Sequence, residues 1–379
     1  MSFTLSEEQL EIQLGIHRLA QERIKPRAAE IDEQGKYPFD IKDLLVSHGY
    51  LGANYPVEYG GSGLDVLSYC LIVEEVARVC ASSSQILTVQ ELGVSTFLLG
   101  GSEEIKQRFL PDLATGKKIT AFGLTEPSAG SDVKGILTRA EKVGNHYRIN
   151  GQKCFISNGG VADVYTIFAK TEKGLTAFAV EKDSPGFIVG KLEKKMGIKG
   201  SPTAELFFDD CHIPIENRIG EEGAGFLIAM KTLEKTRPGI GAQALGIAQG
   251  ALDVCLEYVQ KREQFGKPIS SFQGIQFMLA DMAIQIEAAR SLVYRTAYMV
   301  DNLKKSGKNK ELNRLASAAK VFASDMAMKV TTDAVQILGG YGYTRDFPAE
   351  RMMRDAKITQ IYEGTNQIQR TVIARSLID

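Results

Sequence analysis

The stretch NHYRINGQKCFI (residues 145–156) decides what kind of fold the sequence can form. Two runs that suit β-strands flank Asn150-Gly151, the dipeptide best suited to a type I′ hairpin turn. The pattern predicts two antiparallel strands that meet at this turn. We therefore expect a small β-barrel or sandwich in the middle third of the chain. Further short β-type runs, separated by Gly, Pro, Asp and Ser, follow at residues 163–170, 175–181 and 204–208.

The residues before this β region carry helical signals. Ser6 and Gln9 form a capping-box pattern at the start of the first helix. A second helix is predicted over residues 64–81, and the Pro- and Gly-rich residues 55–61 predict a loop between the two. The N-terminal third is therefore expected to be mostly α-helical. The apolar stripe of the first helix is Ile12, Ile16, Leu19 and Ala20.

The helical period returns at Gly225 and continues in long segments. Residues 276–300 and 312–338 carry apolar side chains on related faces, and Gly339-Gly340 is a typical C-cap for the second of them. The expected fold is multidomain, with α and β parts: an N-terminal α-helical domain, a middle β-barrel or sandwich domain, and a C-terminal four-helix bundle. The predicted domain limits are 1–117, 118–222 and 223–379.

Composition narrows the class of protein. The chain has 379 residues, of which 44% are hydrophobic, so it can bury a large core. Its 45 basic and 46 acidic side chains nearly cancel, and neither a nucleic acid nor a membrane is expected as partner. The first residues lack a secretory signal and no later segment approaches a membrane span, so a cytoplasmic location is expected.

Several common catalytic motifs are missing. Five scattered cysteines never form a CxxC pair and the four histidines lie far apart, so we expect reduced, packed thiols and no metal site. No Gly-Lys pair is followed by the Ser or Thr of a P-loop. Residues 239–244 match GxGxxA but lie in a helical stretch without a preceding strand. Ser131 and Lys134 have the spacing of a serine nucleophile and its base, but the other elements of such a site are lacking.

Three separated segments carry the strongest signals: FGLTEPSAGSD (122–132), REQFGKP (262–268) and IYEGTNQ (361–367). Together with QILGGYG (336–342) and RMMRD (351–355), they resemble the acyl-CoA dehydrogenase family. The α-β-α order expected above matches the fold of that family over essentially the full length. The resemblance implies FAD as cofactor and an acyl-CoA thioester as substrate, of a short- or medium-chain type or of an alicyclic type.

The resemblance assigns the first of these segments to the flavin. Its small residues let backbone N–H groups approach a flat ring and an anion closely. Phe122, Leu124 and Thr125 match positions that contact the isoalloxazine ring. Ser131 matches a position that touches an FAD phosphate or the CoA arm of the substrate.

Phe155 and Ser157 match two further residues that flank the flavin, the hydroxyl donating a hydrogen bond near N5. The family often has Trp at the first of these positions, and this chain contains no Trp. The stacking area is then smaller, but an aromatic wall is retained. Alternation along the predicted strand leaves open that Phe155 is only a core residue.

More FAD contacts are implied for the C-terminal region. Arg262, Phe265 and Gln273 match residues that reach across a subunit boundary to the FAD of the neighbouring protomer. A guanidinium group suits paired phosphate oxygens. The resemblance therefore implies a homo-oligomer, at least a dimer and usually a tetramer built as a dimer of dimers. The remaining matches to FAD contacts are Gln336, Gly339, Gly340, Thr365 and Gln367.

Glu363 is the predicted catalytic base. Removing the α proton of a thioester while hydride leaves the β carbon requires a carboxylate on one face of the substrate and flavin N5 on the other. Burial raises the pKa of such a carboxylate toward the range useful for a base. Gly364 lets the chain pass close to the thioester, and by family analogy the N–H of Glu363 binds its carbonyl oxygen.

Other residues of the acyl-CoA site follow from the resemblance. Some relatives carry the base at the position of Thr236, which cannot serve as one. Arg237 matches a CoA contact, and Glu234 stands where many relatives have the shorter Asp. Glu91 matches a position facing the acyl pocket, where small hydroxyl residues are common. A carboxylate there could bind a polar substrate group or act as a second acid or base on an alicyclic acyl-CoA. The alternative is an exposed or hydrogen-bonded glutamate without such a role.

Three functions stay open. The first is dehydrogenation of an acyl-CoA to the enoyl-CoA with an electron-transferring flavoprotein as acceptor; its variant, resting on Glu91, takes an alicyclic or dicarboxylic acyl-CoA. The second is an acyl-CoA oxidase that passes electrons to oxygen, although such oxidases typically have longer chains. The third is a CoA-binding protein without chemistry, and the intact Glu363 weighs against it.

Overall fold

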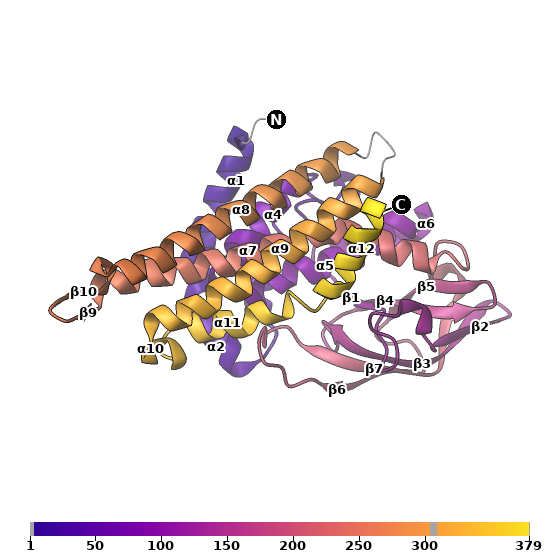
Figure 1. Ribbon diagram of the computed structural model, residues 1–379. Helices are drawn as coiled ribbons and strands as arrows, with labels where there is room; N and C mark the ends of the chain where they lie inside the picture. The colour runs from indigo at the N-terminus through magenta and orange to yellow at the C-terminus, as the bar shows by residue number, and fades with distance from the viewer. Residues whose placement is uncertain (1–3, 304–308, 379) are drawn as a thin grey trace.

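A computed structural model describes residues 4–303 and 309–378, and it follows the helix, strand, helix order expected from the sequence (Figure 1). The N-terminal helices are α1 (Glu7–Leu19), α2 (Ala28–Gln34), α3 (Phe39–Ser47), α4 (Val66–Val79), α5 (Ala81–Gly100) and α6 (Glu103–Ala114). The C-terminal helices are α7 (Gly225–Lys261), α8 (Gln273–Leu303), α9 (Asn309–Leu338), α10 (Gly340–Tyr343), α11 (Ala349–Ile358) and α12 (Asn366–Ile378).

The first helix begins as the sequence predicts. Ser6 Oγ accepts a hydrogen bond from the N–H of Gln9 at 3.2 Å, and Gln9 Oε1 accepts one from the N–H of Ser6 at 3.0 Å. Ile16 and Ala20 of the apolar stripe are fully buried. Helix α4 confirms the second predicted helix, and residues 55–61 form the expected loop around a short 3-10 turn.

The middle strands form one eight-stranded sheet in the order β6-β7-β3-β2-β4-β5-β8, with β1 paired in parallel to β4. The sheet curls, because rings from strands that are not neighbours in this order touch across it. Tyr147 of β3 packs edge-on against Phe178 of β5, with ring centroids 4.9 Å apart. The strands are β1 (Thr120–Gly123), β2 (Arg139–Val143), β3 (His146–Ser157), β4 (Val164–Thr171), β5 (Gly174–Glu181), β6 (Phe187–Leu192), β7 (Thr203–Pro214) and β8 (Arg218–Ile219).

The hairpin predicted at Asn150-Gly151 is wrong. Strand β3 runs straight through this dipeptide, and the register with β7 shifts there from Ile149 opposite Cys211 to Gly151 opposite Phe208. The irregular backbone that glycine permits is therefore used for a bulge rather than a turn. The reversal lies earlier, at residues 144–145 between β2 and β3, where Gly144 has a φ of 59°.

Helix α7 lies at the centre of the helical part, where it packs against α4, α5, α8 and α9. It contains the GxGxxA match at 239–244, which is thereby confirmed as helical and not a turn after a strand. By length and composition alone α7 could cross a membrane, contrary to the expectation that no segment comes near this. However, 78% of its apolar window is buried inside the protein, as in the core helix of many folds.

Helix α9 ends where the sequence predicts. Gly339 follows it with a φ of 61°, and its N–H donates to the carbonyl of Gln336 at 3.1 Å. Beyond α7 the chain forms a small hairpin, β9 (Glu263–Gln264) with β10 (Lys267–Pro268), before α8 begins. The predicted domain limits near 117 and 222 fall between elements and stay predictions.

Candidate active site

Glu363 lies in the loop between α11 and α12, in an unusual backbone conformation. Its φ is 49° and that of Gly364 is 89°. Non-glycine residues adopt positive φ only where the surroundings hold them there. Gln369 supplies part of this support, because its Nε2 donates to the carbonyl oxygens of Glu363 at 3.0 Å and Gly364 at 3.3 Å. The first turn of α12 thus fixes the loop that carries the predicted base.

The carboxylate of Glu363 is held by a hydroxyl group from a distant part of the chain. Thr236 Oγ1 on α7 donates a hydrogen bond to Glu363 Oε2 at 2.8 Å. The pKa of Glu363 is raised to about 7: burial is the main cause and the charge of Glu91 adds to it, while Thr236, Arg237 and Lys320 act in the opposite direction. A carboxylate of this pKa is partly ionised at neutral pH, which suits a general base.

Glu91 lies in the middle of α5 and is only 1% exposed, so it is not the exposed glutamate of the simplest alternative. Asn54 Nδ2 donates to its Oε1 at 2.8 Å. Burial raises the pKa of Glu91, while Lys235 and Tyr69 lower it. Asn54 Oδ1 and the hydroxyl of Tyr55 are buried without a hydrogen-bond partner among the residues described. Burial and the charge of Glu91 raise the pKa of Tyr55. A polar cluster with unused hydrogen-bonding capacity therefore surrounds Glu91.

Glu234 and Arg237 lie three positions apart on α7, and the charge of Arg237 acts on the base. Arg237 is 6% exposed and donates to Asn313 Oδ1 at 2.8 Å and Ser317 Oγ at 3.2 Å, both on α9. Its Nε and the Oε1 of Glu234 are buried and lack a partner in the described parts of the chain. Both side chains therefore retain capacity for a polar group of a bound molecule.

The segment predicted to meet the flavin is fastened to β3. Lys153 Nζ, fully buried, donates to the carbonyl of Leu124 at 3.1 Å and to Glu126 Oε1 at 2.7 Å. The N–H of Cys154 donates to the carbonyl of Thr125 at 3.0 Å. The structure thus joins residues 122–132 to the strand that carries Phe155.

Phe155 itself is not a core residue. Its side chain is 65% exposed and its φ is 58°, beside a break in the β3–β7 register. The aromatic face is therefore free to cover a flat ligand. Ser157, two residues further on, is half-buried. In the segment predicted to meet the flavin, the ring centroids of Phe122 and Phe168 lie 5.0 Å apart, and Ser131 is exposed.

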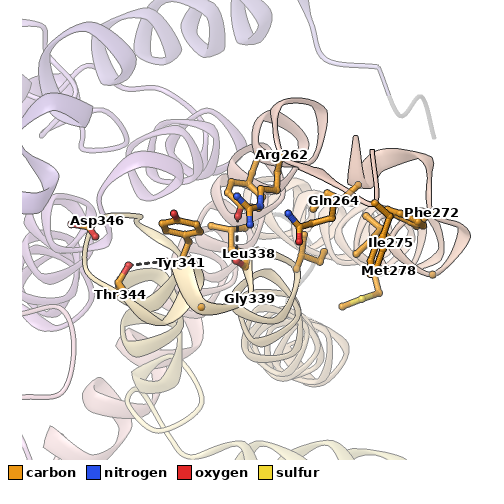
Figure 2. Close-up of a pocket in the computed structure, with 16 residues that line it drawn as sticks. Arg262, Gln264, Phe272, Ile275, Met278, Leu338, Gly339, Tyr341, Thr344 and Asp346 are labelled. Atoms are coloured by element: carbon orange, nitrogen blue, oxygen red, sulfur yellow. Dashed lines mark hydrogen bonds between the residues drawn. The ribbon is translucent and has the colours of Figure 1, made fainter. Parts of the chain in front are cut away.

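A second group of predicted residues lines a cavity of about 840 Å³ near the β9–β10 hairpin (Figure 2). Arg262, Phe265, Gly339 and Gly340 belong to its wall, and the Arg262 guanidinium lies 5.6 Å over the ring of Tyr341. A Cβ added at either glycine would meet no atom within 4 Å. The two glycines therefore leave free space in the cavity wall, which a bulky ligand requires.

The other residues predicted to contact FAD do not line this cavity. Gln273 and Gln336 are exposed and do not line this cavity, although their neighbours Gly274 and Ile337 do. Thr365 and Gln367 instead follow Glu363 closely in the chain: Thr365 Oγ1 accepts from the N–H of Ile368 at 3.3 Å at the start of α12, and Gln367 is exposed.

Figure 1 shows β9–β10 at one end of the long helices and α12 at the other, beside the sheet. Arg262 directly precedes β9 and Glu363 lies just before α12, so the two residues belong to different parts of the chain. The role of Arg262 across a subunit boundary stays a prediction.

The sequence did not reveal four residues that support the site: Lys320, Gln369, Asn54 and Tyr69. For Lys320 a signal existed. It shares a helix face with Ala316, Ala323 and Ala327, all fully buried, so its charge interrupts an apolar stripe. A lone lysine on such a face has to find partners inside the protein.

Comparison with known proteins agrees with this architecture. Models of the acyl-CoA dehydrogenase N-terminal, middle and C-terminal domains match residues 6–117, 121–211 and 223–378. A probable acyl-CoA dehydrogenase of Mycobacterium tuberculosis is 51% identical over 99% of this chain and 97% of its own. A cyclohex-1-ene-1-carbonyl-CoA dehydrogenase of Syntrophus aciditrophicus is 48% identical over 99% of this chain and 91% of its own.

Two solved structures cover 100% of this chain and 100% of their own. Butyryl-CoA dehydrogenase from Megasphaera elsdenii is 48% identical with a TM-score of 0.95. A chain solved in work on the electron transferring flavoprotein of Acidaminococcus fermentans is 50% identical with a TM-score of 0.96. These likenesses define an oxidoreductase that acts on a CH–CH bond. Within that class, the chain belongs to the acyl-CoA dehydrogenase family.

FAD is the cofactor of this flavoprotein family. A glutaryl-CoA dehydrogenase from Mycobacterium smegmatis, solved in complex with FADH2, is 29% identical over 99% of this chain and 95% of its own, with a TM-score of 0.93. The residues present fit such a group. The glycine-lined cavity offers space and a guanidinium, and Phe155 offers an exposed aromatic face.

Proposed function

We propose that this enzyme oxidises a short- to medium-chain acyl-CoA to the enoyl-CoA, with Glu363 as the catalytic base and an electron-transferring flavoprotein as acceptor. The observation that carries the proposal is the half-buried glutamate Glu363, whose carboxylate has a pKa of about 7 and accepts a hydrogen bond from a hydroxyl at 2.8 Å. The likeness to butyryl-CoA dehydrogenase supports the substrate class. The likeness to the chain solved in work on an electron transferring flavoprotein supports the acceptor. The predicted tetramer and cytoplasmic location belong to the same proposal.

In this mechanism the chain prepares and orients the proton acceptor. The ionised carboxylate of Glu363 takes the α proton of the thioester, and the hydrogen bond from Thr236 fixes one of its oxygens. The N–H of Glu363 is aimed by the same strained loop and binds the thioester oxygen, where negative charge develops. A bound flavin would supply the acceptor for the hydride that leaves the β carbon.

A second substrate class is favoured by the polar cluster at Glu91. Among the described residues, buried Asn54 Oδ1 and the Tyr55 hydroxyl have no hydrogen-bond partner, which is costly unless a bound molecule supplies one. The relative from Syntrophus aciditrophicus acts, by its name, on a cyclohexene carbonyl-CoA. A ring that reaches Glu91 would meet an additional acid or base. A dicarboxylic acyl-CoA fits less well, because its carboxylate would meet the charge of Glu91.

Anaerobic titration of the flavin-loaded protein tests both classes. Butyryl-CoA, cyclohexane-1-carbonyl-CoA, cyclohex-1-ene-1-carbonyl-CoA and glutaryl-CoA are added in turn while the oxidised flavin band is followed. We expect rapid bleaching with butyryl-CoA or with a cyclic thioester. Absence of bleaching with all four would contradict the dehydrogenase. Rapid aerobic turnover without an added acceptor would favour the oxidase, and an unchanged preference in Glu91→Gln would remove the alicyclic variant.

A further inference from the structure

Lys320 on α9 is fully buried directly behind the loop of the base. Its Nζ donates to the carbonyl oxygen of Gly364 at 2.9 Å and to Asn366 Oδ1 at 2.9 Å. Asn366 is itself fixed, because its Nδ2 donates to Ser324 Oγ and to Asp325 Oδ1, each at 2.8 Å. One ammonium group therefore ties the residue after Glu363 and the first residue of α12 to α9.

The partners of Lys320 are unusual for a buried ammonium. Lys153, equally buried, forms an ion pair with Glu126 at 2.7 Å. Lys320 has no carboxylate within ion-pair distance in the described parts of the chain, and both its hydrogen-bond acceptors are neutral. A buried charge without such a partner is expensive and marks a functional constraint. The nearest compensation comes from carboxylates somewhat further away, those of Glu363 and Asp325.

We infer that Lys320 is a positioning residue for Glu363: its ammonium group holds the Glu363-Gly364 loop in its strained conformation and keeps the neighbouring carboxylate in the charged form. This inference rests on the proposed role of Glu363 as the base. It assigns to Lys320 no contact with substrate or flavin. Its effect reaches the reaction through the carbonyl of Gly364 and through its charge.

The electrostatics support this geometry. The pKa of Lys320 is lowered to about 7: burial is the main cause and Arg237 on α7 adds to it, while Glu363 and Asp325 act in the opposite direction. The pKa of Glu363 is raised to about 7, mainly by burial; Lys320 and Arg237 act in the opposite direction, whereas Glu91 on α5 adds to the rise. Lysine and glutamate therefore stabilise each other's charged form. Loss of the ammonium would leave the base more strongly protonated at neutral pH.

The test uses Lys320→Met in the flavin-loaded protein. Infrared difference titration, with Glu363→Gln as the reference, follows the carboxyl band of Glu363 without any turnover. We expect its midpoint to rise by about one pH unit. The rate of anaerobic flavin bleaching by butyryl-CoA, or by whichever thioester bleaches the native enzyme fastest, should fall on the order of 10- to 100-fold at neutral pH, because a misplaced base loses alignment. Flavin content and melting temperature report whether the fold is intact.

Three other variants make the result decisive. Lys320→Gln, which keeps a donor but not the charge, is the second variant if Lys320→Met does not fold, and it should shift the midpoint in the same direction. Lys320→Arg keeps the charge and should titrate close to the native protein. Lys195→Met is the matched control, since Lys195 is a partly buried lysine whose Nζ donates to the carbonyl of Ser201 at 2.7 Å, and it is not among the groups that shift the pKa of Glu363. It should shift neither the midpoint nor the rate.

The outcomes separate this inference from the proposed function. If Glu363→Gln abolishes bleaching but the uncharged variants of Lys320 titrate at the native midpoint, the role of Lys320 is overturned and that of Glu363 stands. If Glu363→Gln bleaches at the native rate, Glu363 is not the base, and the positioning role of Lys320 is overturned with it.

Discussion

Glu363 is half-buried and Glu91 is buried, and the charge of Glu91 raises the pKa of Glu363, yet the backbone gives the two glutamates different capabilities. Glu91 lies inside α5, where the N–H of every residue is committed to the helix, so only its carboxylate is available. Glu363 lies in a loop at a φ of 49°, outside any helix. Its N–H and carboxylate can serve one ligand together. The comparison indicates that backbone placement, more than burial, distinguishes a base from an accessory carboxylate.

Neutralising the two glutamates one at a time tests most directly whether their roles differ. Glu363→Gln removes the proton acceptor while keeping the size of the side chain. We expect the rate of flavin bleaching by butyryl-CoA to fall on the order of 10²- to 10⁴-fold, the usual contribution of a general base. Glu91→Gln is the matched variant and should stay within a few-fold of native with this linear substrate. Equal losses in stopped-flow measurements would show that the two carboxylates act as one unit.

The loop itself can be tested at Gly364. A Cβ added there would lie 2.3 Å from Gln369 Nε2, at a φ of 89°. Gly364→Ala should therefore lose about 2–4 kcal/mol of unfolding free energy from left-handed backbone strain and from hydrogen bonds of Gln369. It should also slow bleaching, because the base moves. Denaturant unfolding and stopped-flow absorbance measure the two effects.

Gly144→Ala is the control for the backbone alone. Gly144 has a φ of 59° in the turn between β2 and β3, and a Cβ there would meet nothing within 4 Å. Only the strain of about 1 kcal/mol should appear, with bleaching unchanged. If both variants lose the same stability, the contact with Gln369 contributes nothing to the loop.

The sequence predicted local structure well and tertiary contacts poorly, for a physical reason. Periodicity and caps located α1, α4 and the end of α9, because these depend on residues a few positions apart. The hairpin at Asn150-Gly151 failed because Asn150 pairs with Arg139 of β2 while Gly151 pairs with Phe208 of β7. Pairing on both sides of β3 overrides the turn preference of the dipeptide. The Gly-Asn pair at 144–145, where the chain does reverse, also carries a turn signal.

The same contrast between local signals and tertiary contacts holds for the candidate active site. A motif string located Glu363, but the hydroxyl that holds it comes from 127 positions earlier. Lys320 reaches the loop from 44 positions before Gly364. Neither contact is encoded by spacing, because both depend on how α7 and α9 pack against the loop. Sequence patterns therefore located the base, whereas its support became visible only in three dimensions.

Thr236 tests the hydrogen bond that favours the charged form of Glu363. Bleaching by the native enzyme should increase as pH rises through about 7, because the base works only when ionised. In Thr236→Val the carboxylate loses this bond, its pKa rises, and the midpoint should move upward by about one unit. Thr232→Val is the control: it removes a buried hydroxyl one helical turn away that has no partner among the described residues. A midpoint unchanged in both variants would mean that the hydroxyl of Thr236 does not act on the base.

Glu91→Gln should move the same midpoint in the opposite direction, and by less. The negative charge of Glu91 raises the pKa of Glu363, although more weakly than burial does. Its removal makes ionisation of the base easier, so the bleaching curve should shift downward by under about one unit. Glu75→Gln is the control, because Glu75 is a buried carboxylate paired with His17 and does not act on the base. Opposite shifts in the variants of Thr236 and Glu91 would establish that the two groups act separately on one carboxylate, and a shift of the same sign would indicate a general disturbance of the pocket.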